Sequence, residues 1–338
     1  MMKVKLKEGA GRCFCGLIAV LFLTVPVFLV PVPAALADSS STVANKTIID
    51  RSGCRIIVKK PFRKIISLYG AHTENLFSLG LDAEIIGVSK KETYPPKVKG
   101  KPVFSYHDDA EKFIAARPDL VLIRPMIARG YRQLVVKLQR AGIVVVSLQP
   151  RSIDELYEYW RKLGILTGRE AQAADMIRGF IEKTGYLSSL VRDIPAGARK
   201  KVYFEAIHSR MKTFSPSSIA IFALTTAGGI NVANDASARH GTNIAAYGKE
   251  KILAHAAEID VFLAQSGTMN RVKIDTIKGE PGFMAIKAVR AGRIYIVKEQ
   301  LVSRPTLRLL QGICIIGSCL YPEIFKGVNV SELSLDLH

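Results

Sequence analysis

Short apolar runs that alternate with helical patterns are the feature that most constrains the fold of this chain. The runs are four to six residues long and rich in Val, Ile and Leu, which is typical of strands buried on both faces of a sheet. We expect strands at 64–68, 84–88, 120–123, 143–148, 202–206, 259–264 and 293–297. Because helical patterns lie between most of them, the sequence predicts an α/β fold with mainly parallel sheets covered on both faces.

One long helical pattern divides this alternation into two blocks. Apolar residues from Ile177 to Val191 recur at i, i+3 and i+4 spacing within a segment that runs from Arg169 to about Arg192. Gly179 and Gly185 each weaken this helix by about 1 kcal/mol relative to Ala, so packing against the rest of the protein must hold it. We therefore expect two α/β lobes joined by one long helix. The predicted segments are an N-terminal lobe at 55–167, a connecting helix at 168–194 and a C-terminal lobe at 195–330.

The first 37 residues have the layout of a secretory signal peptide. A basic start precedes the nearly uncharged apolar run Cys15–Val32, and Ala35–Ala37 is a small-x-small cleavage site. A permanent membrane anchor is the alternative, because the run approaches the length of a spanning helix. The prolines inside the run favour cleavage. We expect a periplasmic mature chain that begins near Asp38, with a leader at 38–54.

The composition narrows the possible partners. The 338 residues carry a formal net charge of +19, which suits an anionic ligand, nucleic acid or anionic lipid. The basic residues are spread along the chain, without a basic helix or a stacking-aromatic motif, and export also argues against nucleic acid. We therefore expect no nucleic-acid partner.

Motifs that would indicate an enzyme are missing from the sequence. No Gly-x-Gly-x-x-Gly follows a strand, and neither a phosphate loop, a Gly-x-Ser-x-Gly elbow nor His-Glu-x-x-His occurs. Three cysteines remain after cleavage: Cys54, Cys314 and Cys319. Their odd number and scattered spacing indicate no disulfide framework and no zinc site. Cys314 and Cys319 lie in an apolar stretch and are expected to be buried small hydrophobic residues.

Several polar residues are candidates for ligand contact. Tyr69 and His72 follow the first strand, at the carboxyl end where open α/β sheets bind ligands, although helix capping and packing would also explain them. Tyr106-His107-Asp108-Asp109 is the densest polar cluster and could contact a metal centre. The alternative for this cluster is a solvated loop whose Asp109 caps the next helix.

Two further features concern charge. Arg304 and Arg308 flank Pro305 and could clamp an anion, or could be surface ion-pair partners. Glu111-Lys112-Phe113-Ile114-Ala115 is echoed by Glu250-Lys251-Ile252-Leu253-Ala254, and each copy precedes an acidic residue and a strand. The echo suggests two lobes of related design, each with an exposed glutamate at a helix start.

Residues 63–80, Arg-Lys-Ile-Ile-Ser-Leu-Tyr-Gly-Ala-His-Thr-Glu-Asn-Leu-Phe-Ser-Leu-Gly, resemble the opening of class III periplasmic substrate-binding proteins of ABC importers. This family serves ferric siderophores, cobalamin and haem. Further segments that resemble the family, in the same order, are Tyr94-Pro95-Pro96, Glu111 with Ala116–Val121, Ala227–Asn231, Ala288–Tyr295 and Arg304-Pro305. Together they cover about residues 55–325.

The resemblance implies two lobes bridged by a rigid helix, with the ligand in the cleft between them. It also implies that Glu111 and Glu250 dock on arginines of the permease, whereas without it they would be ordinary acids at helix N-termini. Haem binders of this family often use a Tyr near the position of Tyr106, but the spacing to Glu111 is one or two residues short. Arg124 stands where cobalamin binders tend to place an aromatic ring. A cationic cleft built from Arg124 and Arg304, with Arg308 as a further candidate, suits an anionic ferric chelate or a small oxyanion.

We therefore expect an exported, monomeric receptor that passes a ferric siderophore to an ABC permease with its ATPase and transforms nothing chemically. It would need no cofactor, and whether protein side chains ligate a metal is left open. The candidate cleft residues are Tyr69, His72, Tyr106, His107, Arg124, His208 and Arg304. His208 is included because it follows the strand at 202–206. The alternatives are cobalamin, haem or molybdate binding by the same fold, a metal-dependent periplasmic enzyme using His107 and Asp108, and a sensor module.

Overall fold

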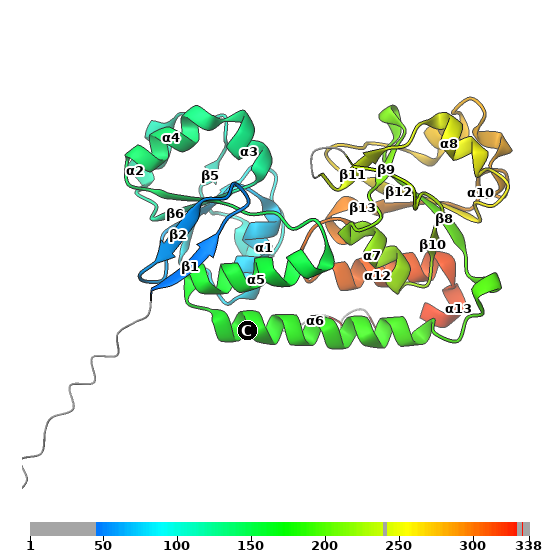
Figure 1. Ribbon diagram of the computed structural model, residues 1–338, viewed down its shortest axis with the longest axis horizontal. Helices are drawn as coiled ribbons and strands as arrows, with labels where there is room; N and C mark the ends of the chain where they lie inside the picture. The colour runs from blue at the N-terminus through cyan, green and yellow to red at the C-terminus, as the bar shows by residue number, and fades with distance from the viewer. Residues whose placement is uncertain (1–44, 239–241, 330–332, 334–338) are drawn as a thin grey trace, which may run out of the picture. The chain divides into compact units, whose positions relative to one another are not determined.

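The computed structural model describes residues 45–238, 242–329 and 333 (Figure 1). The predicted signal peptide and the first part of the predicted leader lie outside these residues. The described chain begins with an antiparallel hairpin of β1 (Lys46–Ile49) and β2 (Arg55–Val58), where the sequence analysis placed the end of a leader. The hairpin is ordered by packing, because Ile48 and Val58 are buried in the main core.

The N-terminal lobe contains a five-stranded, fully parallel sheet in the order β5-β4-β3-β6-β7. Its strands are β3 (Ile65–Ser67), β4 (Ile85–Ser89), β5 (Val103–Phe104), β6 (Leu120–Ile123) and β7 (Val144–Ser147). Its helices are α1 (Gly70–Ser78), α2 (Ala110–Ala116), α3 (Pro125–Gly130) and α4 (Arg132–Arg140), with a short 3-10 helix at Pro96–Val98. Every residue of β6 is buried, as expected for a parallel strand covered on both faces.

The C-terminal lobe contains a six-stranded sheet in the order β11-β9-β8-β12-β13, with β10 also paired to β8. Its strands are β8 (Lys201–Ile207), β9 (Lys212–Phe214), β10 (Ile230–Asn231), β11 (Ile244–Ala246), β12 (Val261–Ser266) and β13 (Ile294–Lys298). Strands β8, β10, β12 and β13 pair in parallel, whereas β9 and β11 form an antiparallel edge. Its helices are α7 (Ile219–Thr226), α8 (Lys249–Ala254), α9 (Ile274–Lys278), α10 (Lys287–Arg290), α11 (Glu299–Val302), α12 (Leu309–Leu320) and α13 (Pro322–Phe325).

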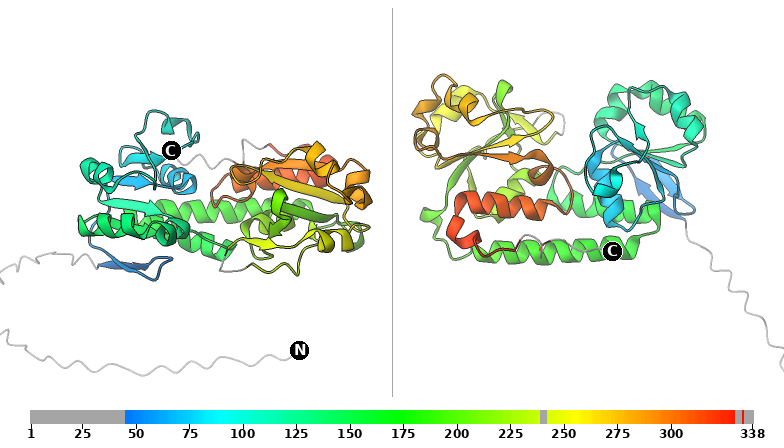
Figure 2. Two further views of the ribbon diagram at one scale, coloured as in Figure 1. Left: turned by 90° about the horizontal axis from the view of Figure 1, so that it is seen from above. Right: turned by 180° about the vertical axis from the view of Figure 1, so that it is seen from behind.

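Two helices follow β7 and lead from the first lobe to the second. Helix α5 (Ile153–Thr167) begins at Ser152, whose Oγ accepts a hydrogen bond from the Glu155 amide, and ends at Gly168 in the left-handed region. Helix α6 (Glu170–Leu190) is the predicted long helix. It runs beneath both lobes and contacts α5, α7 and α12 (Figures 1 and 2).

A continuous apolar core joins the two lobes. It extends from β3 and β6 through Trp160 of α5 and Phe180 of α6 to Phe204 of β8 and the buried face of α12. Two smaller clusters lie under α2–α4 and in the outer half of the C-terminal lobe. Because one core serves both lobes, the base of the molecule from α5 to α12 resists hinge motion.

The structure also places the three cysteines that follow the predicted cleavage site. Cys54 is exposed, Cys314 is buried and Cys319 is half-buried, and all three are free. Burial raises the pKa of each of the Cys314 and Cys319 thiols to about 11, so both stay protonated at neutral pH. Within the described part of the chain, no helix combines the length and hydrophobicity needed to span a bilayer.

Candidate ligand-binding cleft

A cavity of about 700 Å³ lies between the two lobes. The N-terminal lobe contributes the hairpin turn at Asp50, Arg51 and Gly53, the segment Arg124–Arg129, and the residues after β7, Gln149 and Arg151. The C-terminal lobe contributes Met269 and the residues from Thr242 to Ile244. The cavity thus lies at the carboxyl ends of β6, β7 and β12, where open α/β sheets bind ligands.

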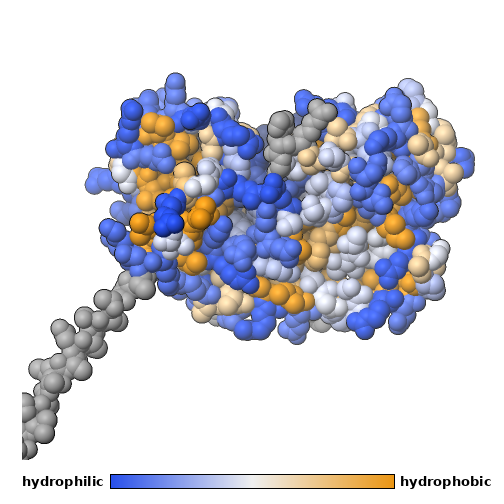
Figure 3. All heavy atoms as spheres, viewed as in Figure 1, coloured by the Kyte–Doolittle hydropathy of each residue, from blue (hydrophilic) through white to orange (hydrophobic). Residues whose placement is uncertain are grey.

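The charge on the cavity wall is predominantly positive. Among the described residues, Arg51, Arg124, Arg129 and Arg151 line it, against the single carboxylate of Asp50. That carboxylate is already used by the hairpin turn: Oδ1 accepts from the amides of Ser52 and Cys54 at 2.8 and 2.9 Å, and Oδ2 accepts from Ser147 at 3.0 Å. Hydrophilic residues dominate the face between the lobes (Figure 3). Such a wall concentrates anions near the cavity.

Arg124 and Tyr69 are brought together, because the strands that they follow, β6 and β3, are neighbours in the sheet. Arg124 precedes α3 at the end of β6, and its guanidinium carbon lies 4.6 Å from the centroid of the Tyr69 ring. Burial raises the pKa of the Tyr69 phenol, although the charges of Arg124 and Arg304 lower it in part. Arg124 lines the cavity, and the ring of Tyr69 packs against its guanidinium group.

His72 belongs to the core. Its side chain is fully buried, with Nδ1 2.7 Å from the Tyr159 hydroxyl and Nε2 3.1 Å from the carbonyl oxygen of Ile123. Burial lowers the His72 pKa to about 3, so the ring is neutral at physiological pH. In the arrangement that satisfies both contacts, Nε2–H donates to Ile123 and Nδ1 accepts from Tyr159. No nitrogen of His72 is left for a ligand in the cleft.

Tyr106 and His107 form an aromatic cluster with Tyr131, and none of the three lines the cavity. The three ring centroids lie 4.5 to 5.1 Å apart, and the Tyr131 hydroxyl is 3.2 Å from Nδ1 of His107. Asp108 pairs with Lys112 at 2.6 Å, and the hydrogen bond from Lys112 lowers the Asp108 pKa. Asp109 occupies the N-cap position of α2 but makes no capping hydrogen bond. Among the described residues, no group of three or more His, Cys, Asp or Glu side chains could hold a metal ion.

His208 also lies outside the cavity wall. It follows β8, but its ring turns into the C-terminal lobe, where Nδ1 is 2.8 Å from Oε2 of Glu205 and Nε2 is 3.6 Å from Oε2 of Glu280. The hydrogen bond with Glu205 raises the pKa of His208, and burial raises the pKa of Glu205. The pair is therefore a buried polar network in the outer lobe and not part of the cleft.

This pair predicts that stability depends on pH. The folded-state pKa of His208 lies above its unfolded value, so its contribution to stability is full below about pH 6.5, the unfolded pKa of histidine, and is lost as pH rises through the raised His208 pKa. The raised pKa of Glu205 adds a loss that begins at lower pH, above the unfolded glutamate pKa of about 4.3. We expect the free energy of unfolding to decline above pH 6.5 in urea titrations. His208→Gln should flatten that decline, and an equal decline in the variant would contradict the assignment.

Arg304 and Arg308 form an ion-pair cluster with Glu74 that joins the two lobes. Glu74 of α1 is buried, and its Oε2 accepts from Nε of Arg308 at 2.9 Å while Oε1 accepts from Nη2 of Arg308 at 2.5 Å and from Nη1 of Arg304 at 3.4 Å. Beside it, Nδ2 of Asn75 donates to the carbonyl oxygen of Pro305 at 2.8 Å. The predicted anion clamp is thus occupied by a carboxylate of the protein itself, and neither arginine lines the cavity.

A comparison with known proteins decides the family. Residues 65–301 match the family of periplasmic binding proteins. The chain belongs to this family. The match agrees with the resemblance to class III substrate-binding proteins that the motifs indicated.

Two curated relatives and one solved structure are similar over most of this binding protein. An uncharacterized ABC transporter substrate-binding lipoprotein of Bacillus subtilis (strain 168) is 27% identical over 294 residues, covering 86% of this chain and 90% of the relative. A cobalamin-binding protein of Halobacterium salinarum (strain ATCC 29341 / DSM 671 / R1) is 24% identical over 285 residues, covering 82% and 75%. A possible iron-binding (periplasmic solute-binding) protein of Staphylococcus epidermidis aligns with a TM-score of 0.67 at 28% identity, covering 78% of this chain and 100% of the other.

The binding protein presents Glu111 and Glu250 at matching positions. Each is the second residue of its helix, Glu111 in α2 and Glu250 in α8, and each is exposed. The nearest cation that pairs with Glu111 is Nζ of Lys137 at 3.8 Å, which is a long and solvated contact. The internal echo in the sequence therefore corresponds to an equivalent local placement in the two lobes.

Three of the arginines that line the cleft were not predicted as cleft residues from the sequence. Arg51 lies in the hairpin turn, Arg129 in α3, and Arg151 just before the cap of α5. A signal for the turn was present, since the Ile pairs at 48–49 and 56–57 flank Asp50 and Gly53 in a pattern typical of a hairpin. No local signal marks Arg129 or Arg151 as cleft residues, because their meeting depends on the order of β6 and β7 in the sheet.

Proposed function

We propose that this protein is the substrate-binding component of an ABC importer and that it captures an anionic metal chelate of the ferric siderophore type. The observation that carries the proposal is the cavity between the lobes, lined by Arg51, Arg124, Arg129 and Arg151. Guanidinium groups bind carboxylate, catecholate and phosphate oxygens with two parallel hydrogen bonds, and they remain charged at any physiological pH.

The size and polarity of the cavity support a chelate over the alternative ligands. Its volume of about 700 Å³ falls within the range of roughly 300–1,000 Å³ usual for small-molecule sites. A single small oxyanion such as molybdate would leave most of it unfilled. None of the described residues on its wall is aromatic, so the cavity offers no ring to stack on the flat face of a porphyrin or corrin. The similarity to a cobalamin-binding protein and to a possible iron-binding protein is compatible with a metal-containing ligand.

The proposed role is transport without chemistry. The mature, exported protein would act as a monomer in the periplasm, bind its ligand there and release it unchanged to an inner-membrane permease with its ATPase. The relatives from Bacillus, Halobacterium and Staphylococcus support this role, because each of them is named as a binding protein. The ligand would be the cargo, so no resident cofactor is needed.

A panel of ligands tests the function. Thermal melting of the protein from Asp38 would be followed with an anionic ferric tricatecholate, a neutral ferric trihydroxamate, cobalamin, haem and molybdate. We expect the anionic ferric chelate to raise the melting temperature most, since a ligand that binds only the folded state stabilises it. If only cobalamin, haem or molybdate raised the melting temperature, the proposed ligand class would be wrong. Turnover of a ligand would contradict the transport role.

Docking on the permease gives a separate prediction. We propose that Glu111 and Glu250 pair with arginines of the permease, one from each lobe. Glu111→Lys and Glu250→Lys should each reduce ligand uptake by at least about tenfold, because like charges facing each other cost several kcal/mol at an interface. Ligand affinity should stay unchanged, since neither residue lines the cavity.

The matched control for docking is Glu182→Lys, which reverses an exposed glutamate on α6. Uptake with this variant should equal that of the wild type when measured with the cognate permease and ATPase. Wild-type uptake in both Glu111→Lys and Glu250→Lys would contradict the docking proposal and leave the ligand proposal intact.

A further inference from the structure

The hairpin turn fixes Arg51 at the wall of the cavity. Besides the three amides from which Asp50 accepts, the amide of Arg51 itself donates to the carbonyl oxygen of Ser147 at 2.8 Å, at the end of β7. Gly53 takes a φ of 82° in this turn, a conformation that side chains rarely adopt. The backbone of Arg51 is therefore held relative to the sheet, and only its side chain is free to reorient.

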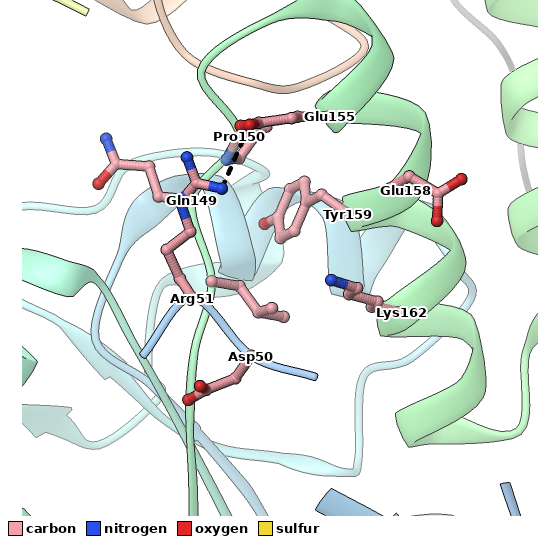
Figure 4. Close-up of a pocket in the computed structure, with 9 residues that line it drawn as sticks. Asp50, Arg51, Gln149, Pro150, Glu155, Glu158, Tyr159 and Lys162 are labelled. Atoms are coloured by element: carbon pink, nitrogen blue, oxygen red, sulfur yellow. Dashed lines mark hydrogen bonds and ion pairs between the residues drawn. The ribbon is translucent and has the colours of Figure 1, made fainter. Parts of the chain in front are cut away.

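The guanidinium of Arg51 is incompletely satisfied. Its Nη1 lies 3.2 Å from Oε1 of Glu155, whereas Nη2 is buried and has no hydrogen-bond partner within the described part of the chain. Figure 4 shows Arg51 pointing from the hairpin toward Glu155 at the start of α5. A buried donor without a partner costs free energy, and a ligand oxygen reached by a small rotation of this side chain would recover it.

One carboxylate serves two arginines here. Oε1 of Glu155 is also 3.2 Å from Nη2 of Arg151, and Oε2 accepts from the Arg151 amide at 2.8 Å. Burial alone would raise the pKa of Glu155, but the hydrogen bonds from Arg151 and the charge of Arg51 bring it below its ordinary value, so it stays ionised. The side chains of Arg51 and Glu155 are 29% and 33% exposed. Arg51 lines the cavity, and Glu155 lines an adjoining pocket that shares Asp50, Arg51 and Gln149 with it.

We propose that Arg51 is a ligand-binding residue that selects for anionic groups, and that Glu155 competes with the ligand for it. Glu155 holds Arg51 and Arg151 and neutralises part of their charge. An anionic ligand draws the guanidinium of Arg51 away from this shared carboxylate, whereas a neutral ligand does not. The inference rests on the proposed function, because it requires that the cleft bind an anionic chelate.

Calorimetric titration of the Arg51→Gln variant tests whether Arg51 binds the ligand. Loss of one charge-assisted contact should weaken binding of a ferric tricatecholate about 10- to 100-fold and reduce its dependence on salt. Binding of a neutral ferric trihydroxamate should change by less than about twofold, because a ligand without charge makes no such contact. The matched control is Arg178→Gln, which removes an exposed arginine of α6 paired with Asp175, outside the cavity. Arg51→Lys should restore part of the affinity, and unchanged melting temperatures would show that the variants fold.

A double-mutant cycle tests the competition. Glu155→Gln keeps a side-chain acceptor for the Arg151 amide but removes the charge, so it should tighten ferric tricatecholate binding about threefold or more in the wild type. In the Arg51→Gln background the same change should have a smaller effect. Wild-type affinity in Arg51→Gln, or equal effects of Glu155→Gln in both backgrounds, would overturn the inference. Failure of the wild type to bind any anionic probe would overturn the proposed function and the inference with it.

Discussion

Glu74→Ala is expected to lower the free energy of unfolding by about 3–5 kcal/mol, the usual cost of removing one partner from a buried ion pair. The exposed fraction of the Glu74 side chain is 4%, and those of Arg304 and Arg308 are 19% and 13%. Without the carboxylate, two guanidinium groups in a largely water-free setting lose the acid with which both form ion pairs. The loss should appear as a lower midpoint in urea unfolding monitored by Trp160, which is itself fully buried in the shared core.

Two controls separate this effect from a general loss of surface charge. Glu182→Ala removes an exposed glutamate of α6 and should change stability by less than about 0.5 kcal/mol. Glu74→Gln keeps hydrogen-bond acceptors and should fall between Glu74→Ala and the wild type. A loss below about 1 kcal/mol for Glu74→Ala would mean that the cluster does not hold the lobes together energetically.

Arg124→Gln is expected to weaken binding of an anionic ferric chelate by about 10- to 100-fold, the effect of one lost hydrogen bond to a charged group. An aromatic ring holds the Arg124 side chain in position, because its guanidinium group packs on the ring of Tyr69. Tyr69→Leu should therefore reproduce part of the loss, whereas Tyr69→Phe, which keeps the ring face, should retain most of the affinity.

The measurement is a calorimetric titration of each variant with a ferric tricatecholate. Arg178→Gln again serves as the control for removing a positive charge far from the cavity. Binding by Arg124→Gln at wild-type strength would remove Arg124 from the site. Equal losses in Tyr69→Phe and Tyr69→Leu would instead assign the support to the phenol hydroxyl.

The elements that the sequence predicted well are those with a complete local signal. The apolar run at 120–123 became β6, and the i, i+3, i+4 pattern became α6 at Glu170–Leu190. These features depend on residues that are close in the chain, so local physical chemistry determines them.

The features that were missed depend on contacts between distant residues. Helix α3 is a six-residue helix opened by Pro125, and β9 and β11 are three-residue strands whose pairing is invisible without the sheet. Arg304 was expected in the cleft as part of an anion clamp, because no local signal shows that Glu74, 230 residues away, pairs with it. His72 carried no sign that Tyr159 and Ile123 would occupy both of its ring nitrogens.

The most direct test of the central claim is the affinity of the wild-type protein for an anionic ferric chelate at two salt concentrations. We expect tight one-to-one binding of a ferric tricatecholate that weakens as ionic strength rises, because salt screens the four arginines of the cleft from the ligand. Absence of binding at low salt, or binding that is tight but indifferent to salt and equal for a neutral trihydroxamate, would contradict an anion-selecting cleft.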